Sequence, residues 1–164
     1  MIKMKKLIID SSLTQMHKVE EFVEMISDIY NINTNYYSTI LMALDEATRN
    51  AIEHGNNFDK AKKVTIQFKA SKGELVFQVK DEGRGFRMDA VKDPLSLSAD
   101  MYNSAGKGVF LMKQLSDGIG QNEEGNEVSL HFKISSINND LAVHRSQALK
   151  TYFQNQTEIV KTSI

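Results

Sequence analysis

The sequence predicts an α+β fold of two layers, in which helices cover one face of a mixed but mostly antiparallel sheet. Three observations predict it. Two segments with helical spacing of apolar residues come before residue 55, two segments with alternating apolar residues lie between residues 63 and 81, and a third alternating segment lies near residue 130. Because strand follows strand between residues 63 and 81, a doubly wound parallel sheet is disfavoured.

Length, charge and composition limit the classes of function. A chain of 164 residues is long enough for one domain with one sizeable core. Its 20 Lys and Arg residues nearly balance its 21 Asp and Glu residues, so no overall field attracts nucleic acid or an anionic membrane. The absence of cysteine excludes disulfides and thiolate catalysis. No apolar run has the length of a signal peptide or a membrane span, and we expect a soluble cytoplasmic protein.

The first half of the predicted domain is a strand followed by two helices. Residues 2 to 9 are apolar enough for a strand, and their lysines suit the edge of a sheet. From Thr14 to about residue 30, and again from about residue 35 to 54, apolar residues recur at the spacing of amphipathic helices. "NINTN" separates the helices, and Gly55 ends the second. The apolar stripe of the second helix comprises Tyr37, Ile40, Leu41, Leu44, Ala47, Thr48 and Ala51.

The second half is predicted to contain a hairpin, a connector, a short helix and a closing strand. "KVTIQFKA" and "ELVFQVKD" alternate as strands do, and "SKG" joins them. A polar connector from about residue 87 to 105 contains Pro94 and has no clear period, which is typical of a functional lid or a mobile loop. "GKGVFLMKQLSD" has the spacing of a helix, and "GNEVSLHFKI" that of the last strand. We expect residues 1–135 to form the domain and residues 136–164 an extension that is helical or disordered.

Glu46 and Asn50 lie one turn apart on the side of the second helix that is roughly opposite Leu44. On helices in general, such a pair is more often a solvated face than a site. The alternative is chemical, because a carboxylate can accept a proton from an attacking hydroxyl, and an amide oxygen can bind a hard cation such as Mg²⁺. That alternative requires phosphate groups nearby.

The segment "DEGRGF" is one place to look for a nucleotide. Asp81 stands at the end of a predicted strand, and Gly83 and Gly85 let the backbone turn sharply and approach a ligand closely. By itself the motif is an ordinary turn more often than a site. A carboxylate there can also accept a hydrogen bond from an exocyclic amine such as N6 of adenine.

The segment "AGKGVF" also has two glycines separated by one residue, here at the start of a predicted helix. Backbone N–H groups after Gly106 and Gly108, together with the helix dipole, favour a phosphate, and Lys107 adds positive charge. A loop or a helix cap explains this motif alone equally well. Neither a Walker A nor a Rossmann pattern is present. The scattered histidines do not predict a zinc site, and no G-x-S-x-G motif predicts a hydrolase.

The order and spacing of these motifs together resemble the GHKL (histidine-kinase-like) ATPase superfamily and, within it, the anti-sigma-factor serine/threonine kinases of the RsbW type. "LDEATRNAIEHGN" resembles the N box of that family, "VKDEGRGF" its first glycine box, "SAGKGVFLMKQLSD" its lid and second glycine box, and "GNEVSLHFK" its closing strand. The resemblance covers about residues 7 to 134. It implies a Bergerat-type ATP-binding fold.

The resemblance implies a role for each motif. Glu46 would be the general base and Asn50 the Mg²⁺ ligand, while Asp81 with Gly83 would contact adenine. The residues expected to contact ATP or ADP, or the bound metal, are Asn50, Asp81, Gly83, Gly85, Gly106, Lys107 and Gly108. The implied reaction transfers the γ-phosphoryl group of ATP to a serine or threonine of a STAS-domain anti-anti-sigma factor. A sigma factor and a second copy of the chain are the other implied partners.

A second function remains open, namely a nucleotide-gated binding module with little or no kinase activity. Some family members place an arginine shortly before the second glycine box, and "MYNSAGKG" has none. Lys107 or Arg84 would have to take its place. The catalytic domain of a histidine kinase is disfavoured, because no helical segment before residue 14 could carry a phosphoacceptor histidine.

Overall fold

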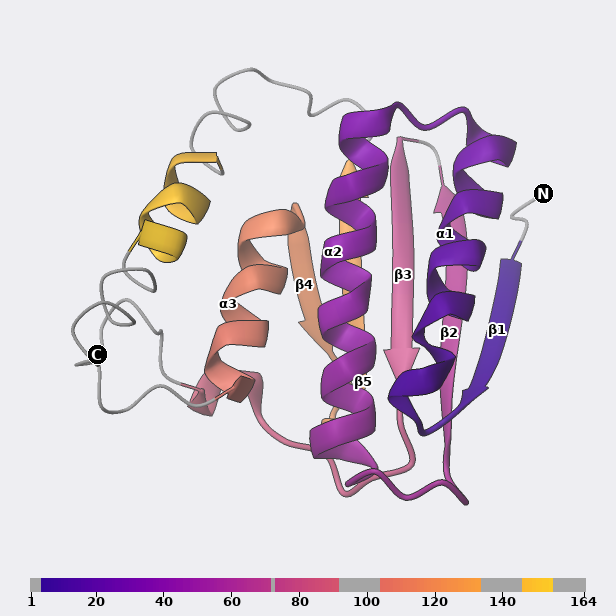
Figure 1. Ribbon diagram of the computed structural model, residues 1–164, viewed down its shortest axis with the longest axis vertical. Coiled ribbons are helices and arrows are strands. Elements are labelled where there is room, and N and C mark those ends of the chain that lie inside the picture. Colours follow the sequence, from indigo (N-terminus) through magenta and orange to yellow (C-terminus); the bar gives the residue numbers. More distant parts are fainter. Residues whose placement is uncertain (1–3, 72, 92–103, 134–145, 155–164) are drawn as a thin grey trace.

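The computed structural model describes residues 4–71, 73–91, 104–133 and 146–154 (Figure 1). Its strands are β1 (Met4–Asp10), β2 (Lys63–Ser71), β3 (Glu74–Lys80), β4 (Gly118–Gln121) and β5 (Glu127–Lys133). Its three long helices are α1 (Met16–Tyr30), α2 (Thr34–Asn50) and α3 (Ser104–Leu115). Short 3-10 turns occur at Leu13–Gln15 and Met88–Ala90, and a π-helical turn, Ala51–Gly55, continues α2. Residues 146–154 are also helical.

The break between α1 and α2 falls at "NINTN", as predicted. Asn31 adopts a left-handed conformation with φ 50°, which ends α1. Asn33 then begins α2, because its side-chain oxygen accepts a hydrogen bond from the backbone N–H of Tyr36 at 3.0 Å. Two asparagines therefore cap the two helices in turn.

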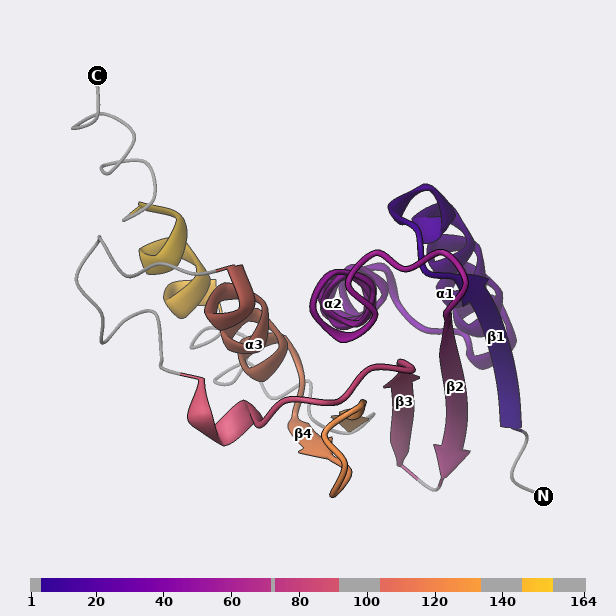
Figure 2. The same ribbon diagram turned by 90° about the horizontal axis from the view of Figure 1, so that it is seen from below.

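The five described strands form one sheet in the order β1-β2-β3-β5-β4, and every neighbouring pair is antiparallel. In the β2–β3 hairpin Phe68 pairs with Phe77 and Ile66 with Val79. The helices α1, α2 and α3 all lie on the same face of the sheet, as Figures 1 and 2 show. The predicted fold class, an α+β structure of two layers, is confirmed.

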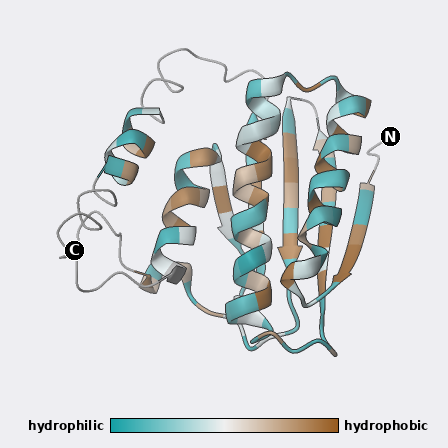
Figure 3. Cartoon of the chain, viewed as in Figure 1, coloured by the Kyte–Doolittle hydropathy of each residue, from teal (hydrophilic) through white to brown (hydrophobic). Residues whose placement is uncertain are grey.

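The core lies between the sheet and the helix layer. Phe68, Phe77 and Phe132 come from β2, β3 and β5 and are completely buried, with neighbouring ring centroids 5.0 Å and 6.1 Å apart. Ile40 and Leu44 of α2 join the same cluster and are also completely buried. In Figure 3 hydrophobic residues recur in bands along α2, as expected for an amphipathic helix that covers a sheet.

Two elements were not predicted in the form that the structure shows. β4 was missed because two of its four residues are glycines, which have low strand propensity and carry no side chain that could alternate. Its pairing with β5 makes it a strand. The second helix was predicted as one element, whereas its last five residues form a π-helical turn. Most of the predicted connector, residues 92–103, lies outside the described residues.

None of the described helices combines the length and the apolar composition that a membrane span requires.

Candidate functional site

Glu46 and Asn50 face α3. Gly108 of α3 lies so close to them that an added Cβ would be 2.6 Å from Asn50 Nδ2 and 3.1 Å from Glu46 Oε2. Glycine at this position lets the backbone of α3 approach both side chains. The structure therefore brings together residues from two of the predicted motifs, the N box and the second glycine box.

Asn50 is buried although it lies opposite the apolar stripe of α2. Asn50 is only 8 % exposed to solvent, and its side-chain Nδ2 has no hydrogen-bond partner among the described residues. Leaving such a group unpaired costs about 1–3 kcal/mol, so a ligand that pairs with it gains correspondingly. The interpretation of this side of α2 as a solvated face is wrong for Asn50, because α3 covers it.

Glu46 is half-buried on the same side of α2. Burial raises the pKa of its carboxyl group above the ordinary value, and nearby Asp45 and Glu53 act in the same direction. Arg49 opposes this shift, although its guanidinium also lies 3.8 Å from the Glu53 carboxylate. A carboxylate with a raised pKa is a stronger base, which suits a group that accepts a proton.

Asp81 lies just beyond the end of β3, where Gly55 and Gly83 are its close neighbours in space. Asp81 is 8 % exposed, and its Oδ1 accepts a hydrogen bond from the backbone N–H of Gly83 at 2.7 Å. A Cβ added at Gly55 would lie 2.3 Å from Asp81 Cγ, and one added at Gly83 would lie 2.0 Å from the carbonyl oxygen of Gly55. The π-helical turn and the loop after β3 therefore touch directly, with no side chain between them.

Burial also raises the pKa of Asp81 above its ordinary value. The hydrogen bond from the Gly83 N–H and the charge of Lys62 act in the opposite direction. A carboxylate can accept several hydrogen bonds, and the N–H of Gly83 donates only one. Asp81 can therefore also accept a hydrogen bond from a ligand.

Sequence analysis missed Asn56, which joins the segments around Asp81. Its side chain is completely buried; Oδ1 accepts from the N–H of Glu82 at 2.9 Å, and Nδ2 donates to the carbonyl oxygen of Lys63 at 3.0 Å. It therefore links the end of the π-helical turn to β2 and to the loop after β3. An asparagine after a helix-ending glycine signals a helix stop, and nothing in the sequence shows which distant backbone groups it bonds.

Gly85 packs against the turn between β4 and β5. Its φ of 79° suits glycine, and an added Cβ would lie 1.9 Å from the carbonyl oxygen of Glu124. Gln121, which sequence analysis also missed, holds the same segment: its Nε2 donates to the carbonyl oxygen of Phe86 at 2.5 Å, and its Oε1 accepts from the N–H of Met88 at 3.2 Å. The structure thus shows Gly85 in a packing contact that positions the first glycine box.

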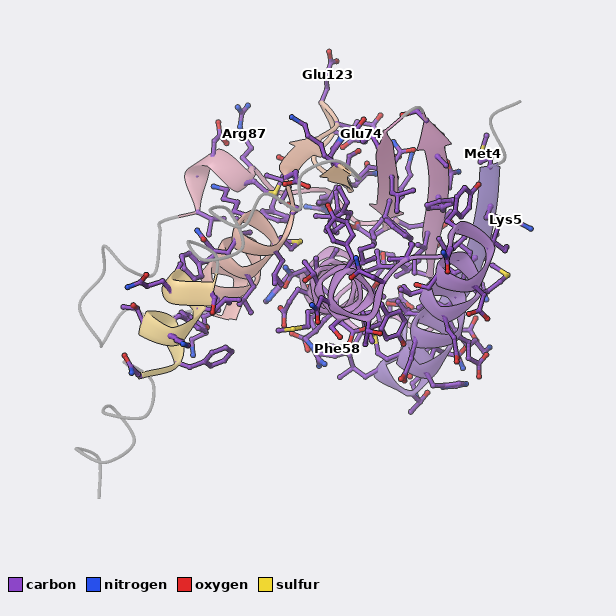
Figure 4. All side chains as sticks on the ribbon, turned by 90° about the horizontal axis from the view of Figure 1, so that it is seen from above. Met4, Lys5, Phe58, Glu74, Arg87 and Glu123 are labelled. Carbon is purple, nitrogen blue, oxygen red and sulfur yellow. The ribbon has the colours of Figure 1, made fainter. Side chains whose placement is uncertain are left out.

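A surface groove lies beside this segment, lined by residues 84–89, Lys113 and residues 119–125. Figure 4 shows that Arg87 and Glu123, which line it, lie on the side of the sheet away from the helices. Arg87 is paired there with Asp89 at 2.9 Å. None of Glu46, Asn50 and Gly108 lines the groove, whereas Gly85, one of the predicted site residues, does.

Gly106 and Lys107 lie in the first turn of α3, with Gly106 buried and Lys107 half-buried. The positive end of the helix dipole and the charge of Lys107 favour an anion at this end of α3. The candidate site therefore runs from Asp81 along the end of α2 to the start of α3.

We expect Gly83→Ala to lower the free energy of unfolding by about 1–3 kcal/mol, because its Cβ would clash with the backbone oxygen of Gly55. Chemical denaturation measures the effect. Gly120→Ala is the control, since its Cβ would meet nothing closer than the Cβ of Ser129 at 3.8 Å, and we expect a change within about 0.5 kcal/mol. Equal stability of the two variants would contradict the close contact of Gly83 with Gly55.

Comparison with known proteins defines the class. Residues 9–132 match the model of the histidine kinase-like ATPase domain, so the chain belongs to this family. Serine-protein kinase RsbW of Bacillus subtilis is 33% identical over 95 residues, which are 54% of this chain and 59% of that protein. The chain thus spans about three fifths of the length of that relative. The resemblance to RsbW-type proteins is confirmed.

Two further relatives agree. An anti-sigma F factor of Clostridium perfringens is 27% identical over 101 residues, which cover 59% of this chain and 72% of that protein. A crystal structure of the RsbU and RsbW domains of a Mycobacterium tuberculosis protein superposes with a TM-score of 0.52 at 18% identity, covering 79% of this chain and 32% of that one. The structural likeness supports the fold.

Proposed function

We propose that the protein is an ATP-dependent serine/threonine kinase and anti-sigma factor that phosphorylates a STAS-domain anti-anti-sigma factor. One observation carries the proposal: the half-buried carboxylate of Glu46 and the buried, unpaired amide of Asn50 meet the backbone of α3 at Gly108. Phosphoryl transfer can use a base, an amide whose Nδ2 donates to a phosphate oxygen while its Oδ1 binds a cation, and a backbone close to both. The family match and the relative described as a serine-protein kinase point the same way.

The residues around Asn50 fit a magnesium ion that is held mainly by phosphates. The described residues contain no group of three His, Asp or Glu side chains that could hold a metal ion by themselves. Mg²⁺ commonly takes one or two protein ligands, with substrate phosphates and waters in its other positions. Asn50 would be the protein ligand, and the bound ion would neutralise charge on the phosphates.

Each of the predicted site residues has a defined task in the proposed reaction. Asp81 accepts a hydrogen bond from the exocyclic amine of adenine, with Gly83 beside it, and Gly106, Lys107 and Gly108 hold phosphate oxygens. The serine or threonine oxygen of the partner attacks the γ-phosphorus, the bond from that phosphorus to the bridging oxygen of ADP breaks, and the hydroxyl proton passes to Glu46. Positioning and charge neutralisation supply most of the acceleration.

The other partners follow from the relatives. Proteins described as anti-sigma F factors are similar to this chain over more than half its length, which supports a sigma factor as the protein that is sequestered. We propose a cytoplasmic homodimer with no direct nucleic-acid contact, as the resemblance to RsbW-type kinases implies. We also propose residues 1–135 as the kinase domain and 136–164 as an extension.

The alternative is a nucleotide-gated module that holds a partner but transfers little or no phosphate. The absence of arginine from "MYNSAGKG" favours it, since removing one cation from a phosphoryl-transfer site can cost about 10³-fold or more in rate. Glu46 favours the kinase, because a module that only binds nucleotide has no need of a base.

Incubation with Mg²⁺ and ATP labelled in its γ-phosphate separates the two functions. We expect label to appear on one STAS-domain protein from the same genome, and to disappear when the acceptor serine or threonine is replaced by alanine. Asn50→Ala is the matched enzyme control and should abolish labelling. ATP binding without label on any STAS protein would favour the module, and absence of ATP binding would contradict both functions.

A further inference from the structure

Residues 146–154 cover the side of α3 that faces away from α2. They lie beyond residues 9–132, the part of the chain that matches the family. In Figures 1 and 2 the helix formed by these residues lies beside α3, with α3 between it and α2. The contact is aromatic: the rings of Phe110 and Tyr152 stack with centroids 5.3 Å apart and planes inclined by 28°.

The aromatic pair lies outside the core cluster, although Leu149 of the same helix packs against that cluster. Phe110 is 5 % exposed and Tyr152 is 2 % exposed, yet neither is a member of the cluster between the helices and the sheet. Val109 and Met112 of α3 do belong to that cluster. α3 is therefore held to the domain by one side and covered by residues 146–154 on another.

Phe110 and Gly108 lie on opposite sides of α3. Two positions along a helix correspond to a rotation of about 200°. Gly108 meets Glu46 and Asn50 on one side, and Phe110 meets Tyr152 on the other. Gly108 has no side chain that could fix the distance between α3 and α2. The contact on the opposite side of α3 therefore affects how closely the α3 backbone approaches Glu46 and Asn50.

We propose that residues 146–154 brace α3 and that Tyr152 is a positioning residue for the phosphate end of the nucleotide site. Tyr152 acts through Phe110 on the α3 backbone at Gly106 and Gly108 and does not touch the nucleotide itself. That the positioned site binds ATP rests on the proposed function; that Tyr152 holds α3 does not. Stacked aromatic rings have a preferred geometry, which makes them suited to fixing one element against another.

Amide hydrogen exchange without nucleotide tests the brace. We expect Tyr152→Ala to speed exchange in α3 by about tenfold or more, with α1 unchanged. Tyr152→Phe keeps the ring, so its exchange in α3 should stay much closer to that of the wild type than the exchange of Tyr152→Ala does. Phe153 packs edge-on against Tyr152 with ring centroids 5.4 Å apart but is 48 % exposed, so Phe153→Ala should have a smaller effect. If Tyr152→Ala does not fold, Tyr152→Leu keeps the apolar bulk without the ring and should show the same change in α3.

ATP affinity tests the link to the site. We expect Tyr152→Ala to weaken ATP binding several-fold and Tyr152→Phe to restore it. Unchanged exchange in α3 would overturn the brace, and faster exchange with unchanged ATP affinity would overturn the positioning role. Asn50→Ala separates the two hypotheses, since it should weaken ATP binding without changing exchange in residues 146–154. If the wild type binds no ATP, the proposed function and the positioning role both fail, while exchange in α3 still decides the brace.

Discussion

Glu46→Gln is expected to lose phosphoryl transfer and keep ATP binding. Glutamine has nearly the same shape but cannot accept the hydroxyl proton, and loss of a general base lowers a rate by about 10²–10⁴-fold. Transfer to the STAS partner and ATP affinity should be measured on the same preparation. Only the rate should fall.

Glu53→Gln is the matched control for this variant. Glu53 lies on the same side of the extended helix, is also half-buried, and is paired with Arg49. The side-chain atoms nearest to a Cβ added at Gly108 belong to Asn50 and Glu46. We expect nearly wild-type transfer. A Glu46→Gln variant that phosphorylates the partner at the wild-type rate would exclude Glu46 as the base.

The pH profile of transfer gives a second readout of Glu46. The base must be ionised to accept a proton, so the rate falls as the pH drops through its pKa. Because burial raises that pKa, the acid limb of the wild-type profile should lie above the pH at which an ordinary glutamate titrates. In Glu46→Gln this limb should be missing from the residual activity.

Asp81→Asn is expected to weaken ATP binding by about 10–100-fold, because it removes the charge of the carboxylate that we propose accepts a hydrogen bond from the adenine amine. The fold should survive, since the asparagine oxygen can still accept from the Gly83 N–H. Stability should not fall. Burial raises the Asp81 pKa, so the folded state is penalised for the ionised form at neutral pH, and a neutral side chain removes that penalty.

The opposite directions of the two effects distinguish loss of a ligand contact from damage to the fold. Calorimetric titration with ATP and chemical denaturation would measure them. Asp89→Asn is the control, because Asp89 is exposed and pairs with Arg87. ATP affinity that is equal in Asp81→Asn and in the wild type would remove Asp81 from the site.

Much of the fold could be predicted because its elements carry strong periodic signals. Val64, Ile66 and Phe68, which alternate along β2, are completely buried, and most of the predicted stripe of α2 is buried, with Tyr37 and Leu41 half-buried. β4 carries no such signal, because two glycines leave its four residues without a pattern. Its strand conformation depends on the neighbouring β5, which lies beyond a turn.

The predicted site residues were found from motif order, and the residues that support them were not. Asn56 and Gln121 act through hydrogen bonds to the backbone of segments 26 and 35 positions away. Their bonding depends on distances between strands and loops, which no local pattern encodes. Tyr152 lies in the extension that the sequence predicts only as helical or disordered, because a single ring in a polar segment shows no period.

The sequence by itself determined the spacing of Glu46 and Asn50, since residues four apart on a helix must share a side. It also determined that glycines, with no side chain to obstruct a neighbour, stand at residues 83 and 108. Only the tertiary structure decided that α3 covers Asn50, that the loop after β3 touches Gly55, and that residues 146–154 cover Phe110. Helical spacing fixes directions around one axis, whereas burial and contact depend on where a second element packs.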